Sequence, residues 1–164
     1  MLLRKNRLCA IAFWFAISAI VIMLDQCSKA WVLANLSEAH TYSVAPHFNL
    51  FLTYNKGIAF SMFANSGDVA YYALCSLSIA IVLLLAFMQY KTELNRYLLH
   101  CAIAFIIGGA IGNLFDKILL GHVVDFIDFY WGGWHFAVFN LADSFISIGG
   151  ALFLLDAFIY DPAN

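Results

Sequence analysis

Four long runs of apolar residues divide the chain. They cover residues 8–24, 69–88, 97 to about 115, and about 137 to 160. A helix needs about 20 such residues to cross the hydrocarbon layer of a bilayer, so the pattern predicts four transmembrane helices. Four crossings place both chain ends on one side of the membrane.

A cleaved signal peptide is the alternative interpretation of the first run, because basic residues precede it. The run ends in Asp25-Gln26 without a small-residue cleavage site, however, and three more apolar runs follow. We therefore expect a transmembrane helix here, and one membrane domain over residues 1–164.

Residues 47–54, between the first two runs, alternate between apolar and mostly polar side chains. A period of two is typical of a strand with one apolar face. Asn55-Lys56-Gly57 is typical of a turn, and residues 58–63 are the expected returning strand. The pattern predicts a small exterior β-hairpin on an otherwise all-α membrane protein.

Composition supports a membrane location, because 64% of the residues are hydrophobic and 11% are charged, against roughly 25% charged in soluble domains. The net charge is −2, and no basic run follows a phosphate backbone, which excludes nucleic acid as a partner.

The distribution of Lys and Arg predicts the orientation. Five of these residues lie on the side of the termini and three on the other side, which favours cytoplasmic termini, N-in and C-in. The segments 25–68 and 116–136 are then exterior.

Ionisable and amide side chains gather in and beside the last two apolar runs. They are Asn113, Asp116, Lys117, Asp125, Asp128, Asn140 and Asp143. A charge inside a membrane segment costs several kcal/mol unless it is compensated, so the group as a whole indicates a functional site. Gly108 and Gly112 offer a flat helix face for close packing beside it.

Asp25 and Lys29 are four residues apart and share a helix face. The simplest interpretation is an ion pair at the end of the first helix, at the level of the lipid headgroups. Such an exposed pair is worth a few tenths of a kcal/mol.

The residue types restrict the chemistry. His122 and His135 lack the spacing of metal ligands, and the adjacent Ser28 and Lys29 point to different helix faces, so neither a metal site nor a serine–lysine pair is expected. Carboxylates remain, from the segment of Asp125 and Asp128 and from Asp143. Two acids close together cannot both ionise, so one is an acid and the other a base that activates water against an amide. For any single acid, a structural role in capping or pairing is the alternative.

Five ordered blocks carry a resemblance to a known family. They are DQCSK (25–29), NKGIAFS (55–61), GGAIGNLFDK (108–117), VVDF (123–126) and FNLAD (139–143). On these blocks the chain resembles the lipoprotein signal peptidases, or signal peptidase II, which are bacterial membrane aspartic peptidases.

The resemblance implies a function. Enzymes of this family cut the signal peptide from prolipoproteins just before a cysteine that carries a diacylglyceryl group. It implies a multi-pass protein of the inner membrane with its active site on the exterior side and a small β-cradle. Diacylglyceryl-prolipoproteins and membrane lipid are the expected partners; no cofactor or metal is expected, and no oligomer is required.

The resemblance also implies roles for residues. The catalytic pair falls on Asp125 and Asp143, and Asp128 lacks that role. The residues that line the site are Asn55, Asn113, Lys117 and Asn140, and those that support it are Asp25, Lys29, Gly57 and Asp116. Lys117 stands where the family usually has arginine, so the planar donor fork is lost there.

A small proton- or ion-coupled transporter is the alternative function, because acids inside a membrane also relay protons. The acids cluster toward one face, however, and the repeats typical of transporters are missing.

Overall fold

The computed structural model describes the chain except residues 1, 39, 56–66 and 161–164. Its helices are α1 (Leu2–Asn35), α2 (Gly67–Lys91), α3 (Tyr97–Leu120) and α4 (Leu141–Ile159), and its strands are β1 (Thr41–Ala45), β2 (Phe48–Asn55), β3 (Val123–Trp131) and β4 (Trp134–His135). All four helices are long and apolar enough to cross a membrane, which confirms the four predicted spans.

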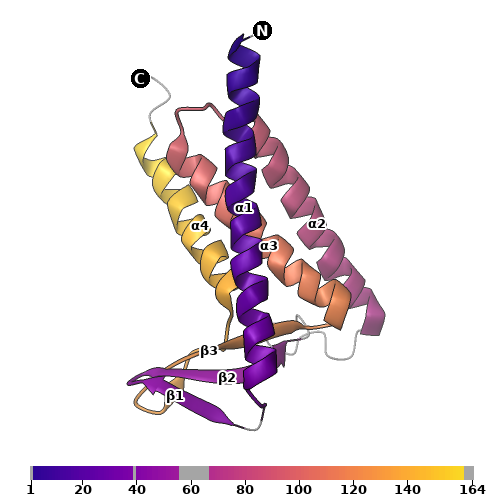
Figure 1. Ribbon diagram of the computed structural model, residues 1–164, viewed down its shortest axis with the longest axis vertical. Coiled ribbons are helices and arrows are strands. Elements are labelled where there is room, and N and C mark those ends of the chain that lie inside the picture. The colour runs from indigo at the N-terminus through magenta and orange to yellow at the C-terminus, as the bar shows by residue number, and fades with distance from the viewer. Residues whose placement is uncertain (1, 39, 56–66, 161–164) are drawn as a thin grey trace.

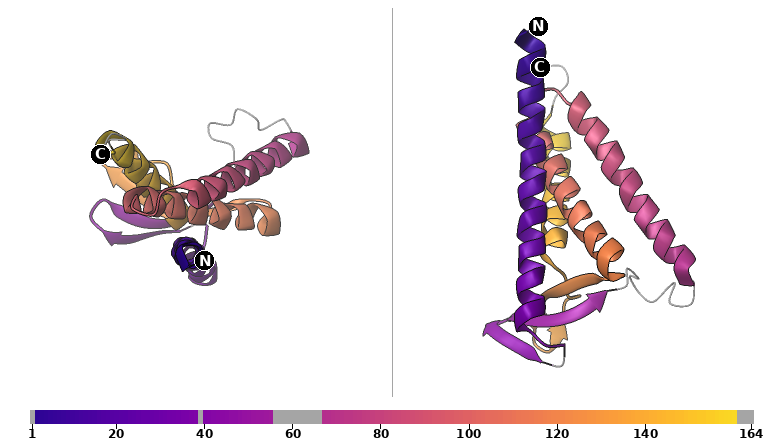
Figure 2. Two further views of the ribbon diagram at one scale, coloured as in Figure 1. Left: turned by 90° about the horizontal axis from the view of Figure 1, so that it is seen from above. Right: turned by 45° about the vertical axis from the view of Figure 1, so that its right-hand side comes forward.

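Helix α3 lies at the centre and packs against the other three helices (Figure 1). Small residues allow this packing: a Cβ at Gly109 would lie 2.5 Å from the Ala142 carbonyl oxygen of α4, and one at Gly108 would lie 2.6 Å from Cβ of Val21 in α1. The predicted close packing of this helix face is confirmed. Helix α2 leans away from α1 toward the end of the bundle that carries the sheet (Figure 2).

The four strands form one antiparallel sheet in the order β1-β2-β3-β4, which lies across one end of the bundle (Figure 1). The end of α1 packs on the sheet through Val32, which lies against Leu52, Val124 and Phe126. This apolar cluster fixes β3, and therefore Asp125, relative to α1.

The hairpin prediction was right about one strand and incomplete about its partners. Residues 48–55 do form a strand, but β2 pairs with β1 on one side and with β3 on the other. The expected returning strand at 58–63 and Gly57 lie outside the described residues. Asn55 is the last residue of β2.

Two helices extend further than their apolar runs. Helix α1 continues to Asn35, so Asp25 and Lys29 lie inside it, and α3 continues to Leu120, so Asp116 and Lys117 are helical. The predicted ends stood at the first charged residues. Asp25, Lys29 and Asp116 compensate one another across α1 and α3, and α3 ends where Gly121 adopts a left-handed conformation with φ 77°.

Candidate active site

The two aspartates of the expected pair come from different elements. Asp125 lies on β3, buried, and Asp143 lies in the first turn of α4, half-buried. Asn140 caps α4: its side chain accepts a hydrogen bond from the backbone N–H of Asp143 at 2.9 Å, and the Asp143 carboxylate accepts one from the Asn140 N–H at 3.3 Å. This capping box places Asp143 in the first turn of α4 and fixes its carboxylate against the backbone of Asn140.

Two asparagines connect the aspartates. Asn140 donates to an Asp125 oxygen at 2.7 Å, and Asn113 of α3 donates to an Asp143 oxygen at 2.7 Å. The second N–H of Asn140 donates to the side-chain oxygen of Asn113 at 3.0 Å. The chain Asp125–Asn140–Asn113–Asp143 therefore holds both carboxylates in one network.

Lys29 anchors this network from α1. Its ammonium group lies 2.8 Å from Asp25, 2.8 Å from Asp116 and 3.0 Å from the side-chain oxygen of Asn113. These contacts use all three N–H donors, and the residue is only 2% exposed. The interpretation of Asp25 and Lys29 as an exposed interfacial pair was wrong, because the pair is buried and shares a third charge from α3.

The two acids that flank Lys29 also hold backbone groups. Asp25 accepts a bond from the N–H of Ala142 at 3.0 Å, and Asp116 accepts one from the N–H of Val124 at 3.1 Å. They thereby fix the start of α4 and of β3 against α1 and α3. Gly112 permits this, since a Cβ there would lie 2.6 Å from an Asp25 oxygen.

Asp125 is protonated more easily than an ordinary aspartate. Burial is the largest cause and raises its pKa to about 6. The hydrogen bond that Asn55 donates at 3.1 Å lowers the pKa, the Asp143 charge raises it, and Asn140 and Lys29 lower it. Asn55 reaches Asp125 from β2, along the diagonal of the paired strands.

Asp128 lies apart from this network. It is three residues from Asp125 on the same strand, and residues at odd spacing point to opposite faces of a sheet. Its carboxylate accepts hydrogen bonds from Asn49 of β2 at 3.0 Å and from Nδ1 of His135 of β4 at 2.8 Å. Residue types alone left Asp125 and Asp128 equivalent, and strand geometry separates them.

Lys117 lies one turn beyond Asn113 on α3. Both residues line a cavity of about 260 Å³ between α2, α3 and α4, whose other lining residues are Ser78, Ile81, Ile106, Ala110 and Ile146. Lys117 thus shares a cavity with Asn113 of the network.

Sequence reasoning missed Gln26, although it is adjacent to Asp25. Its amide donates to Asp25 at 3.1 Å and to Asp116 at 2.9 Å, which links the two acids. Its place beside Asp25 in the block DQCSK was the available signal.

Comparison with known proteins identifies the family. The family profile described as Signal peptidase (SPase) II matches residues 17–159. The lipoprotein signal peptidase of Serratia proteamaculans (strain 568) is 45% identical over 151 residues, which is 92% of this chain and 89% of the relative. The lipoprotein signal peptidase of Paraburkholderia phymatum is 42% identical, over 90% of this chain and 88% of the relative.

Two solved structures, both described as a bacterial membrane enzyme studied by the in meso method, have the same fold. The one at 1.9 Å resolution is 30% identical with a TM-score of 0.78, covering 92% of this chain and 94% of that one. The one at 2.3 Å is 28% identical with a TM-score of 0.77, covering 90% and 88%. These matches do not support the transporter alternative, and they support a multi-pass membrane protein. The chain belongs to the signal peptidase II family of aspartic peptidases.

Proposed function

We propose that this protein removes the signal peptide of prolipoproteins by hydrolysing the peptide bond just before the diacylglyceryl-modified cysteine, with Asp125 and Asp143 as the catalytic pair. One observation carries the assignment of the pair. Carboxylates from β3 and α4 are held in a single amide network, which is anchored by the buried Lys29 through its hydrogen bond to Asn113. Such positioning is what an aspartate pair needs in order to act on one water molecule.

The environments of the two carboxylates divide the roles. The pKa of Asp125, raised to about 6, makes it the member that carries the proton. Asp143 lies at the N-terminus of α4 and accepts a hydrogen bond from Asn113, and we assign it the role of the base. Asp143 takes a proton from the attacking water, and Asp125 donates its proton to the scissile carbonyl oxygen. As the tetrahedral intermediate collapses, Asp143 gives its proton to the leaving amine, the C–N bond breaks, and a hydroxyl group of the intermediate returns a proton to Asp125.

This division predicts the pH dependence. Protonated Asp125 is required in the free enzyme, so kcat/KM should fall as the pH rises through about 6. This fall of kcat/KM is a property of the aspartate pair as a whole, and it is measured from initial rates of peptide cleavage between pH 4 and 9.

The asparagines have separate tasks. Asn140 uses both side-chain N–H groups, one on Asp125 and one on Asn113, and is therefore a holder of the network. Asn113 spends one N–H on Asp143, and its second N–H is the candidate donor to the substrate or to the tetrahedral oxygen. Asn55 holds the other oxygen of Asp125.

The cavity beside Asn113 suits the delivery of the substrate. Its walls are mostly apolar side chains of three membrane-length helices, and Lys117 contributes a cation. The lipid chains of a diacylated substrate remain in the bilayer, which fixes the depth of the scissile bond. Lys117 lies at the level where substrate carbonyl groups would pass.

The proposed location is the bacterial inner membrane, with both termini in the cytoplasm and the sheet and catalytic pair on the exterior side. The excess of Lys and Arg near the termini and between the second and third spans supports this orientation. Cysteine labelling from outside should reach a Lys56→Cys variant and miss a Lys91→Cys variant. The reverse pattern would overturn the orientation.

The decisive test of function is cleavage of a synthetic lipobox peptide by the purified protein in the presence of EDTA. The diacylglyceryl form should be cut just before the modified cysteine, and the same peptide without the lipid is the control. Proton flux into liposomes is measured in parallel. Flux without cleavage would overturn the proposal, and activity that is lost with EDTA and restored by a divalent ion would replace it with a metallopeptidase.

A further inference from the structure

The segment 132–140, here called the strap, connects β3 to α4 and carries Asn140 to the catalytic pair. Backbone hydrogen bonds hold it to β3 at separate points: the N–H of Phe136 donates to the Phe129 carbonyl at 2.8 Å, and Phe139 exchanges bonds with Ile127 at 2.8 and 3.1 Å. Before these points, the strap pairs with β3 as β4, with His135 opposite Tyr130 and Trp134 opposite Trp131. The position of the strap therefore decides where Asn140 meets Asp125.

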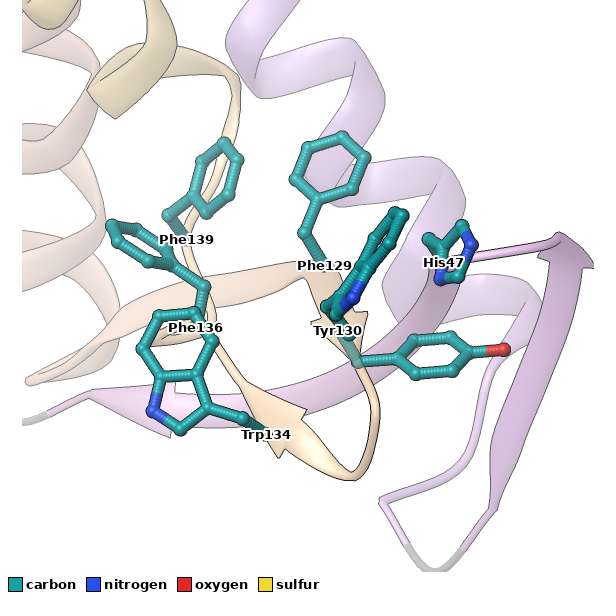
Figure 3. A pocket seen from close by; sticks show the side chains of 7 residues that line it. His47, Phe129, Tyr130, Trp134, Phe136 and Phe139 are labelled. Carbon is teal, nitrogen blue, oxygen red and sulfur yellow. The ribbon is translucent and has the colours of Figure 1, made fainter.

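One face of the strap is loosely packed. Trp134, Phe136 and Phe139 surround a cavity of about 490 Å³ together with Phe129, Tyr130, Trp131 and His47 (Figure 3). Trp134 is 65% exposed and Phe136 is 54% exposed, although both are large apolar side chains. Because an open cavity contributes few contacts, apolar packing on this side adds little to holding the strap on β3.

A polar link joins the strap to β3 beside a second cavity, which Asp128 and His135 line. Nδ1 of His135 lies 2.8 and 3.0 Å from the two oxygens of Asp128, and Asn49, directly opposite Asp128 across the strand pair, donates to it at 3.0 Å. Asp128 is only 3% exposed. Burying a carboxylate costs free energy even when the group is paired. Asp128 lies outside the catalytic network, so its burial indicates another role.

We propose that Asp128 and His135 are positioning residues of the peptidase: their hydrogen bond fixes the strap on β3 and thereby sets the contact of Asn140 with Asp125. This inference rests on the proposed function of Asp125 and Asp143. His135 lies five residues before Asn140, and the intervening chain is bonded to β3 at Phe136 and Phe139. We therefore expect a shift at His135 to reach Asn140 along a short segment that is held to β3.

The geometry connects this link to the protonation of Asp125. The groups that face Asp125 are Asn55 of β2, Asp143 of α4, Lys29 of α1 and Asn140 at the end of the strap. The bond from Asn140 lowers the pKa of Asp125. If the strap loosens and this bond lengthens, the pKa of Asp125 rises and the fall of kcat/KM moves to higher pH.

The test uses matched pairs of variants in the purified full-length protein. His135→Phe keeps the ring, which stacks on Tyr130, but loses the donor, whereas His135→Asn keeps a donor at the position of Nδ1. Asp128→Leu removes the acceptor, and Asp128→Asn keeps a carbonyl oxygen for the His135 N–H. His40→Phe, at an exposed ring beside the sheet, is the control.

His135→Phe and Asp128→Leu should lower kcat about tenfold or more with KM within about twofold, because sub-ångström misplacement of catalytic groups is that costly. In these two variants, the pH at which kcat/KM falls should rise by half a unit or more. In His135→Asn, Asp128→Asn and His40→Phe, this pH should stay near that of the parent. A merely structural role would lower thermal stability without changing this pH. If kcat/KM falls at the same pH as in the parent in both His135→Phe and Asp128→Leu, the proposal is overturned.

Hydrogen–deuterium exchange provides a readout that does not depend on activity. Backbone amides of residues 136–143 should exchange faster in His135→Phe than in the parent and in His135→Asn. Equal exchange in all three proteins overturns the positioning role, whereas failure of the parent to cleave the lipobox peptide overturns the proposed function. The two failures are therefore distinct.

Discussion

The two ends of the helix bundle both bury polar side chains, but they bond them differently. At the sheet end, each N–H of the Lys29 ammonium meets an oxygen of Asp25, Asp116 or Asn113. At the opposite end, the Arg96 guanidinium pairs with Asp156 and lies 3.7 Å from the centre of the Tyr160 ring.

Two buried atoms at that opposite end have no hydrogen-bond partner among the residues that the structure describes: Nε of Arg96 and Oε1 of Gln89. Buried polar atoms are usually bonded, as the charged groups around Lys29 are. We expect the contacts at the sheet end to hold the proposed catalytic pair in place, whereas those at the far end join the helices.

The largest expected effect is on the catalytic pair. Asp125→Asn and Asp143→Asn should each lower cleavage of the diacylated peptide at least about a thousandfold, because an amide cannot transfer the proton. Asp128→Asn should keep substantial activity. A dead Asp128→Asn beside an active Asp125→Asn would show that the assignment of the pair is wrong.

Asp125→Asn should also have a pH-dependent effect on the stability of the fold. The pKa of Asp125 is raised in the fold, from 3.8 to about 6, so its ionised form destabilises the native state. The penalty is absent below the unfolded value and fully present above the folded one. Asp125→Asn should therefore increase the free energy of unfolding at pH 7 by at most about 3 kcal/mol and raise the thermal midpoint there. Near pH 4 the thermal midpoint should be unchanged.

The next effect compares the ion pairs at the two ends of the bundle. Lys29→Met leaves Asp25 and Asp116 as uncompensated buried charges, and breaking a buried pair costs about 3–5 kcal/mol. It also removes a donor from Asn113, so cleavage should fall at least about tenfold among molecules that remain folded. The double variant Lys29→Met/Asp116→Asn should recover part of the stability and none of the activity.

Asp156→Asn is the matched change at the far end. The Arg96 side chain is 22% exposed and can reach water, so the loss should be about 1 kcal/mol, with activity within about twofold of the parent. Thermal unfolding in detergent and peptide cleavage measure both quantities. A loss of activity in Asp156→Asn as large as that in Lys29→Met would contradict the division between the two ends.

The sequence predicted the helices because each is a continuous local signal. It did not predict their ends: Asp25 and Lys29 were taken as the end of the first span, whereas the ion pair is completed by Asp116 from α3. The partner of a buried charge comes from another element, and local spacing does not show it.

The strands were only partly predictable for a similar reason. Residues 48–54 alternate clearly, but β3 is buried over most of its length, with little alternation to mark it. The pairing of Asn49 with Asp128 joins segments that are distant in the chain. Without that strand, Asp125 and Asp128 could be separated only through the family resemblance.

The smallest expected effect concerns Lys117. Lys117→Arg restores the residue that the family usually carries, and its planar fork binds carbonyl or carboxylate oxygens in two contacts, so activity should be equal or up to severalfold higher. Lys117→Ala should lower activity more than stability, because the side chain lines the cavity beside Asn113 and lies outside the Lys29 cluster. Lys91→Ala, at the far end of α2, is the control for loss of a cation. Cleavage rates at subsaturating and saturating substrate separate binding from chemistry, and an effect on KM is expected. If Lys117→Ala matched the parent in both cleavage rates, Lys117 would have no part in the site. The difference between the two ends of the bundle would then rest on the network around Lys29 alone.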